Sequence, residues 1–425
     1  MKEVDFLILG GGLSGLGAAA SLKNRDYLIL EKNSHLLGHA SSFNFQGYSF
    51  DFGTHICHSA NENWLDKLNF KNLNNIENSE VLNFDNGNWI GYPVQNNLRD
   101  LNTEEASIIL SELEKNQARE PDLTNYENWC LSVYGKKLTD NYYRRFTSKY
   151  WRSNMSEMST AWLNGRILPV DINLVKKGFN NKTSSQAVFR SFKYPKKNGF
   201  QDFFSRLTKN LNVIYGANVK AINLDTKTIE LQGGESIKFN KIINTLPLNY
   251  IYKIIEAPMK LKKLSKNLKY LNLITTAVVL PFEKNHQALP DWFYIYDSDI
   301  EMSRVKNISR ISASKNRGLA LQFETFRRND EKFDYETLLK DIEKDCKTVL
   351  SSFNCDDIQI NNTFSEYSYV VSTIETESIR EKLINYLEKV NINTCGLYGT
   401  WEYMWSDKSF YSGYNLGKKL LNKNG

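Results

Sequence analysis

The feature that most constrains this chain is a glycine-rich turn between a short apolar strand and a helix. Residues 4–9 read VDFLIL, and Gly10-x-Gly12-x-x-Gly15 then opens a segment of helical composition. In such a turn the first glycine allows a tight bend, the second lets the backbone approach a pyrophosphate, and the third lets helix and strand pack closely. The helix N-terminus adds partial positive charge and free N–H donors. The pattern predicts a dinucleotide-binding βαβ unit whose phosphate turn is formed by Gly10, Gly12, Leu13, Ser14 and Gly15.

An acidic residue at the end of the next strand completes this fingerprint. Residues 26–30 read DYLIL, and Glu31 follows them. A carboxylate at this place can accept hydrogen bonds from a ribose hydroxyl. Strand, turn, helix and acid together favour a binding site over a glycine-rich turn of no function. They do not distinguish NAD from FAD, because both share an ADP half.

The composition is that of a globular protein with an ordinary charge balance. The 425 residues are enough for two or three domains, and 41% of them are hydrophobic. The 54 basic and 48 acidic residues leave a net charge of +6, which does not form the basic stripe that nucleic acid requires. A few well-placed arginines for an anionic small molecule fit this excess equally well.

Cysteine usage and the apolar segments bear on where in the cell the protein is expected. The five cysteines include no CxxC pair, which argues against a disulfide scaffold and a zinc site. We therefore expect no metal and a cytoplasmic location. The apolar residues 6–22 could be taken for a signal peptide, but Glu3 and Asp5 leave no positive region before them. No other stretch approaches eighteen consecutive apolar residues, so no membrane span is expected.

Strand-like and helix-like segments alternate in a way that is typical of an α/β fold. A hairpin is expected at Asp85-Asn86-Gly87, and helices at residues 103–113, 141–151 and 201–211. The layout predicts a discontinuous Rossmann-like dinucleotide-binding domain, a helical insertion and an antiparallel β-sheet substrate domain. The expected boundaries are 1–90, 195–265 and 392–425 for the first domain, 91–165 for the second, and 166–194 and 266–391 for the third.

The segment at residues 51–59, which reads DFGTHICHS, indicates a family. With Glu31-Lys32 and Gly38, it resembles the FAD site of the UDP-galactopyranose mutases, which carry a Gly-x-His-Ile-x-His-Thr/Ser segment against the flavin. These enzymes lie within the wider superfamily of FAD amine oxidases and protoporphyrinogen oxidases. The resemblance implies FAD as the cofactor, held by the fingerprint residues and by Lys32, Gly38, His39, His55, Ile56, Val219, Ser406 and Asp407.

Further motifs of the same family follow in order along the chain. Residues 92–97 (YPVQNN) look like the loop that holds the uracil in the eukaryotic-type branch, and residues 161–166 (AWLNGR) are similar to its Ala-Trp-Leu-Gly-Glu-Arg segment. Residues 303–305 (SRV) resemble the stretch with its second diphosphate arginine, and 401–407 (WEYMWSD) its closing motif. The resemblance implies that the substrate contacts Tyr92, Val94, Gln95, Asn96, Trp151, Arg166, Arg304, Tyr369 and Tyr403.

Four positions depart from the family pattern. Leu397 stands where the family has an arginine in a Gly-Arg-x-Gly segment, and His39 replaces the second glycine of a pair. Thr147 occupies the place of a substrate-contacting asparagine, and Ile311 that of a tyrosine. These changes bear more on the identity of the sugar than on the class of reaction.

The resemblance also implies a reaction. The family interconverts the pyranose and furanose forms of a UDP-sugar without net oxidation, and it needs reduced FAD. N5 of the flavin attacks the anomeric carbon and expels UDP, and the flavin-bound sugar opens and closes again through another hydroxyl. Arg166 and Arg304 would stabilise the departing diphosphate, and His55 would lie against the isoalloxazine, so these three are the implied catalytic residues. NADPH or NADH is the expected reductant.

Two other functions stay open at this point. A flavin oxidoreductase of the amine oxidase or desaturase type shares the FAD fold, and its pocket should be mostly apolar. A non-catalytic nucleotide-sugar binder is the other alternative, for which Leu397 is the main hint. As a mutase, the protein would supply furanose donors for cell-surface polysaccharide such as capsule. Its partner would be the UDP-sugar, not nucleic acid or a membrane, and a homo-oligomer is compatible with the sequence.

Overall fold

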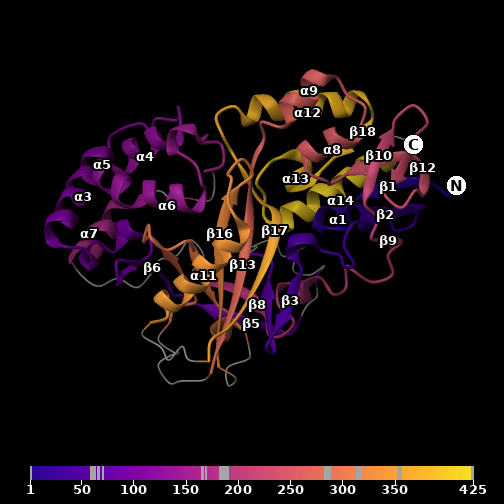
Figure 1. Cartoon of the computed structure of the whole chain (residues 1–425). Helices are drawn as coiled ribbons and strands as arrows, with labels where there is room; N and C mark the ends of the chain where they lie inside the picture. Colours follow the sequence, from indigo (N-terminus) through magenta and orange to yellow (C-terminus); the bar gives the residue numbers. More distant parts are fainter. Residues whose placement is uncertain are drawn as a thin grey trace.

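The structure is a computed structural model that describes residues 2–57, 64, 68, 71–163, 167, 170–180, 191–281, 289–312, 318–351 and 357–422. Two seven-stranded sheets and a group of helices make up most of this part of the chain (Figure 1). Two short antiparallel sheets of two strands accompany them: β3 (Ser42–Phe45) with β4 (Tyr48–Asp51), and β5 (Leu73–Glu77) with β8 (Ser191–Pro195).

The first sheet is built on parallel strands. β1 (Lys2–Leu9) lies between β2 (Tyr27–Glu31) and β12 (Ser236–Asn244). β9 (Val213–Tyr215) joins β2, and β18 (Ile392–Thr394) joins β12. An antiparallel pair, β10 (Val219–Asn223) and β11 (Thr228–Leu231), extends the sheet from the start of β12. All of β2 is buried, which explains its continuous apolar sequence, because a parallel sheet is covered on both faces.

Two helices from opposite ends of the chain pack closely beside this sheet (Figure 1). They are α1 (Leu13–Ser21) and α14 (Ser406–Asn422). A Cβ atom added at Gly17 would lie 2.0 Å from the carbonyl oxygen of Phe410, and one at Gly413 would lie 1.8 Å from that of Ser14. The two glycines therefore allow the backbones of α1 and α14 to touch. This contact holds α1 with its N-terminus at the phosphate turn.

The second sheet has the strand order β17-β13-β16-β15-β14-β6-β7. Every neighbouring pair is antiparallel except β14 and β6, so the sheet is mixed, not purely antiparallel as expected. Helix α11 (Tyr335–Val349) packs with one face of the sheet, where Ile342 joins Val278 and Phe323 in one apolar core. The strands are β6 (Val81–Asp85), β7 (Asn88–Gly91), β13 (Lys269–Leu280), β14 (Trp292–Ile295), β15 (Arg304–Asn307), β16 (Leu319–Arg328) and β17 (Gln359–Val371).

The helical part lies at one side of the molecule (Figure 1). It contains α3 (Thr103–Asn116), α4 (Tyr126–Tyr134), α5 (Lys136–Leu138), α6 (Arg144–Tyr150) and α7 (Ile172–Asn180). The side chain of Asn102 accepts a hydrogen bond from the Glu105 amide and caps α3, and Asn125 caps α4 in the same way. The remaining helices are α8 (Leu248–Ile254), α9 (Met259–Ser265), α10 (Ile308–Ile311), α12 (Thr376–Lys389) and α13 (Gly396–Thr400).

The structure confirms the expected α/β class with a Rossmann-like unit and a second sheet. The hairpin predicted at residues 85–87 joins β6 and β7. The helix predicted over residues 201–211 is wrong, because only a 3₁₀ turn at Phe200–Phe204 forms there. The three-domain division stays a prediction, although β6 and β7 lie in the second sheet and α7 packs among the helices. Among the described residues, no helix is both long enough and apolar enough to cross a bilayer.

Candidate active site

A cavity of about 880 Å³ lies where the first sheet, the second sheet and the helical part meet. Most of the residues predicted to bind a cofactor or substrate line it. They are Gly10, Gly12, Leu13, Ser14, Glu31, Lys32, Gly38, His39, His55, Ile56, Tyr92, Val94, Gln95, Trp151, Val219, Arg304, Tyr369, Tyr403 and Ser406. Gly15, Asn96 and Asp407 do not line it, and Arg166 lies outside the described residues.

The phosphate turn has the open space that a pyrophosphate needs. A Cβ atom added at Gly12 would meet no other atom within 4 Å, so the backbone there is bare toward the cavity. A Cβ at Gly15 would instead lie 2.0 Å from the carbonyl oxygen of Gly10, which places Gly15 in the helix–strand contact. These two glycines therefore serve the two different purposes that the fingerprint assigns to them.

Glu31 is tied to this turn by hydrogen bonds. Its carboxylate accepts one from the Gly11 amide at 2.8 Å and one from the Asn33 amide at 2.9 Å, and it is buried at the edge of the cavity. A carboxylate has roughly four acceptor positions, so two remain for the hydroxyls of a ribose. The residues present thus fit the ADP half of a dinucleotide.

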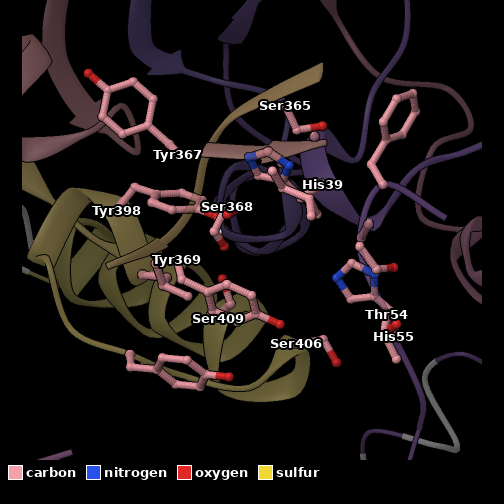
Figure 2. Close-up of a pocket in the computed structure, with 18 of the residues that line it drawn as sticks. His39, Thr54, His55, Ser365, Tyr367, Ser368, Tyr369, Tyr398, Ser406 and Ser409 are labelled. Atoms are coloured by element: carbon pink, nitrogen blue, oxygen red, sulfur yellow. Dashed lines mark hydrogen bonds between the residues drawn. The ribbon is translucent and has the colours of Figure 1, made fainter. Parts of the chain in front are cut away.

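Two histidines face the middle of the cavity. In Figure 2, Thr54 and His55 lie on one side, Tyr369, Tyr398 and Ser409 on the other, and His39 between them. Burial and the nearby His55 lower the pKa of His39 to about 4, and burial also lowers the pKa of His55. Both imidazoles are therefore uncharged at neutral pH.

The ring of His55 has a fixed orientation. Its Nδ1 atom lies 2.9 Å from the carbonyl oxygen of Gly53, so Nδ1–H donates there and Nε2 is left as an acceptor. The ring also stacks on Phe200, with centroids 5.0 Å apart. His39 is placed edge-on to Tyr398 at 5.7 Å. Both histidines can thus contact a flat ring without adding charge.

The segment that carries His55 starts from a buried acid. Asp51 is fully buried, and its Oδ2 lies 2.8 Å from Nζ of Lys306. Although burial alone would raise the pKa of Asp51, the Lys306 ammonium and the hydrogen bonds to the carboxylate hold the pKa below its ordinary value. The sequence does not single out Lys306, because only the folded chain brings β15 to this segment.

Arg304 places a positive charge in the cavity lining, among a group of tyrosines. Its Nε donates to Oε2 of the fully buried Glu324 at 2.7 Å, and one terminal nitrogen donates to the Tyr369 hydroxyl at 3.4 Å. Burial alone would lower the pKa of Arg304, but Glu324 and the tyrosines raise it well above its ordinary value. A permanently charged, oriented guanidinium suits a diphosphate.

The tyrosines around Arg304 were only partly predicted. Tyr369 and Tyr403, both predicted as substrate contacts, stack on each other with centroids 5.7 Å apart. Tyr150, whose ring lies 5.4 Å from the guanidinium carbon, was missed as a site residue. Tyr294, which lies directly opposite Arg304 across β14 and β15, was also missed.

Aromatic residues from the helical part line the far portion of the cavity. Trp151 packs on Trp162 and Tyr369, with centroids 5.2 Å and 5.9 Å apart. Tyr92 packs on Tyr294 at 5.3 Å. Gln95 accepts a hydrogen bond from the Tyr143 hydroxyl at 3.3 Å. Flat rings with a few amide groups among them are suited to a nucleobase.

The four departures from the family pattern fall in different places. Leu397 and His39 line the cavity, so both could contact a cofactor. Thr147 and Ile311 are fully buried and do not line it.

Among the described residues, no group of three or more His, Cys, Asp or Glu is placed to hold a metal ion.

Comparisons with known proteins agree with this geometry. A family model described as "NAD(P)-binding Rossmann-like domain" matches residues 8–69. A Klebsiella pneumoniae protein named "Probable UDP-galactopyranose mutase" is 27% identical over 202 residues, which are 43% of this chain. The match spans only 49% of that relative.

Two solved structures have the same overall fold. The crystal structure of a reduced UDP-galactopyranose mutase superposes with a TM-score of 0.88 and 22% identity, and the alignment covers 99% of this chain and 96% of the other. A redesigned putrescine oxidase superposes with a TM-score of 0.63 and 14% identity over 99% of both chains. These structures confirm the fold that the motif resemblance implies, and the Klebsiella pneumoniae relative supports the resemblance to UDP-galactopyranose mutases.

Proposed function

We propose that this chain, which has the fold of the UDP-galactopyranose mutases, is an FAD-dependent mutase that interconverts the pyranose and furanose forms of a UDP-sugar. The observation that carries the proposal is the mixed lining of one cavity. A bare phosphate turn at Gly12, two uncharged histidines and the charged Arg304 all face it. A nucleotide cofactor and a nucleotide sugar that react with each other need such a combination.

The cofactor end would hold FAD through the backbone near Gly12, the hydroxyl of Ser14 and the carboxylate of Glu31. Reduced FAD supplies an electron-rich nitrogen that can bond to a sugar carbon, so this chemistry requires no nucleophilic side chain. His39 and His55 would border the flavin without placing a positive charge beside it. A reducing cytoplasm would keep the cofactor in its reduced form.

The substrate end would hold the diphosphate on Arg304. Glu324 orients the guanidinium before any ligand arrives, so little reorganisation accompanies binding. The same charge would stabilise UDP as it leaves the anomeric carbon and keep it close for recapture. Arg166 is proposed as the second diphosphate ligand, from the family pattern alone.

The aromatic residues would bind the uridine and exclude water. Stacking of the base between rings near Tyr92 and Trp151 would fix one end of the nucleotide sugar. The diphosphate would then extend from the nucleoside and place the sugar toward the histidines. Holding the two reacting groups in one cavity removes much of the entropic barrier to their reaction. The identity of the sugar is left open by the departures at Thr147, Ile311 and Leu397.

One observation favours a second candidate, a nucleotide-sugar binder without catalysis. Leu397 presents an apolar side chain to the cavity at the position where the family pattern has an arginine. A flavin oxidoreductase of the amine oxidase type is disfavoured, because its substrate would not require the buried charge of Arg304.

The deciding experiment is to incubate the flavin-loaded protein with UDP-sugars, without oxygen, in the presence and absence of reductant. Chromatography should reveal a UDP-furanose only in the reduced sample. UDP-sugar binding with no product from any sugar would support the binder and contradict the mutase. Failure of the purified protein to bind FAD at all would contradict both flavin enzymes.

A further inference from the structure

Lys306 is a buried cation that the proposed chemistry does not use. The residue is fully buried in β15, and its Nζ donates to Oδ2 of Asp51 at 2.8 Å and to the carbonyl oxygen of His55 at 3.0 Å. The ammonium also lies 4.3 Å from the centroid of the Tyr194 ring. Its contacts are thus an acid, a main-chain carbonyl and an aromatic face. The cavity lining does not include Lys306, so it does not reach a ligand itself.

Stability alone does not account for this charge. Taking an ammonium and a carboxylate out of water costs several kcal/mol per ion, and apolar replacements of such pairs are often neutral or stabilising. Asp51 already accepts hydrogen bonds from the Ser42 hydroxyl, the Phe200 amide and the Tyr194 hydroxyl. What Lys306 adds is the bond to the carbonyl of His55.

Two neighbours of Lys306 on the same sheet face bind the rest of this segment. Antiparallel pairing sets Lys306 opposite Gln322, and Arg304 opposite Glu324, so all four side chains share one face of β15 and β16. Gln322 accepts a hydrogen bond from the Asp51 amide at 2.9 Å, and Glu324 accepts one from the Thr54 amide.

We infer that Lys306 is a positioning residue: with Gln322 and Glu324, it clamps the main chain of residues 51–55 and so fixes where the His55 ring meets the flavin. The inference rests on the proposed function for the identity of the flavin. The clamp itself is a property of this chain. Glu324 also orients Arg304, so one face of the second sheet holds both the diphosphate ligand and the wall that borders the cofactor.

The test compares two pairs of neutralising changes, each with its basic residue in the second sheet. Lys306→Met with Asp51→Asn removes the contribution of Lys306 to the clamp without leaving either buried charge of this pair alone. The matched control is Arg327→Met with Glu301→Gln, which removes another ion pair whose arginine is buried and whose residues do not line the cavity. The single variant Lys306→Met is measured beside them, so that the result does not depend on the Asp51 change.

Hydrogen exchange of the peptide that contains residues 51–57 is the first readout, and it is measured without flavin. We expect exchange on the order of 10-fold faster in both Lys306 variants and unchanged in the control. The second readout is the bound flavin. Its dissociation constant should rise on the order of 10-fold, and its reduction potential and visible spectrum should shift, while the affinity for UDP stays at the wild-type value.

Unchanged exchange in both Lys306 variants, or equal effects in the control, would overturn the inference. If the wild-type protein binds no FAD, the proposed function fails, and the exchange measurement still decides whether Lys306 holds the segment. If the Lys306 variants lose UDP affinity as strongly as FAD affinity, Lys306 has only a general structural role.

Discussion

The Nε atom of Arg304 lies 2.7 Å from Oε2 of Glu324, and the other carboxylate oxygen of Glu324 accepts a hydrogen bond from the amide of Thr54. A single buried acid therefore contacts both the proposed diphosphate ligand and the segment that carries His55. The arginine is oriented from the protein side, so its remaining donors can face a ligand.

Replacement of Arg304 or Arg166 by alanine should lower kcat/KM on the order of 10²-fold or more, because each removes a charged donor from the leaving diphosphate. Steady-state kinetics with the reduced enzyme and titration with UDP measure the effect. Thermal unfolding must be followed for Arg304→Ala, because the change leaves Glu324 buried without its partner. Arg327→Ala, away from the cavity, is the control. Turnover near the wild-type value in both site variants would remove the diphosphate assignment.

Substitutions at two glycines of the phosphate turn should separate binding from folding. Gly12→Ala should fold as stably as the wild type, because the new methyl group meets no atom within 4 Å, yet it should fill the space that a pyrophosphate needs. Gly15→Ala should lose stability, by about 1–3 kcal/mol, because its methyl group would overlap the Gly10 carbonyl oxygen. FAD titration and urea unfolding of both variants measure the two effects. Wild-type FAD affinity in a folded Gly12→Ala protein would contradict the proposed phosphate site.

Stability without ligand should fall as the pH drops from about 6.5 toward 4. The pKa of His39 is lowered to about 4 in the folded protein, so in this range the unfolded chain binds a proton that the folded chain does not. The contribution of His39 to the free energy of unfolding is complete above the ordinary pKa of histidine. It is lost progressively as the pH falls below that value. Because His39 is partly open to the cavity, we expect an effect on the order of 1 kcal/mol.

Urea unfolding at several pH values, with the wild type and His39→Gln, measures this dependence. The variant should show a shallower loss of stability across the same range. The exposed His35→Gln serves as the control. Equal pH dependence in the wild type and His39→Gln would show that His39 does not stay uncharged in the folded protein.

Trp151→Ala should weaken the binding of UDP more than the binding of inorganic pyrophosphate. Loss of a ring that stacks on a base costs roughly 1–3 kcal/mol, or about 5- to 150-fold in affinity. Trp89→Ala is a suitable control, because Trp89 is 42% exposed and does not line the cavity. Calorimetric titration with both ligands measures the difference. Equal losses for UDP and pyrophosphate would mean that Trp151 does not contact the base.

The parts of the site that depend on local sequence were predictable. Gly12 and Glu31 act within one βαβ unit, where spacing along the chain determines position in space. The short loop with Tyr92 and Gln95 was found for the same reason, because the motif is contiguous. The Rossmann-like unit and the second sheet followed from the order of strand and helix patterns.

The parts that depend on strand pairing were not predictable. Lys306 looks like any polar residue in a strand until β15 pairs with β16 and Asp51 packs on their shared face. The expected helix after Gly199 does not form, and Phe200, Phe203 and Phe204 are instead buried from a 3₁₀ turn. Asp407, which is predicted to bind the flavin, does not line the cavity, and its carboxylate accepts a hydrogen bond from the Lys408 amide.

The most direct test of the mutase proposal follows the flavin and the sugar in the same anaerobic reaction. Visible absorbance reports the redox state of bound FAD, and proton NMR reports the ring form of the UDP-sugar. The account predicts that the furanose accumulates to equilibrium while the flavin stays reduced, with many turnovers for each flavin. Product formation that requires oxidised flavin, or that changes the flavin's redox state once for each sugar converted, would contradict it.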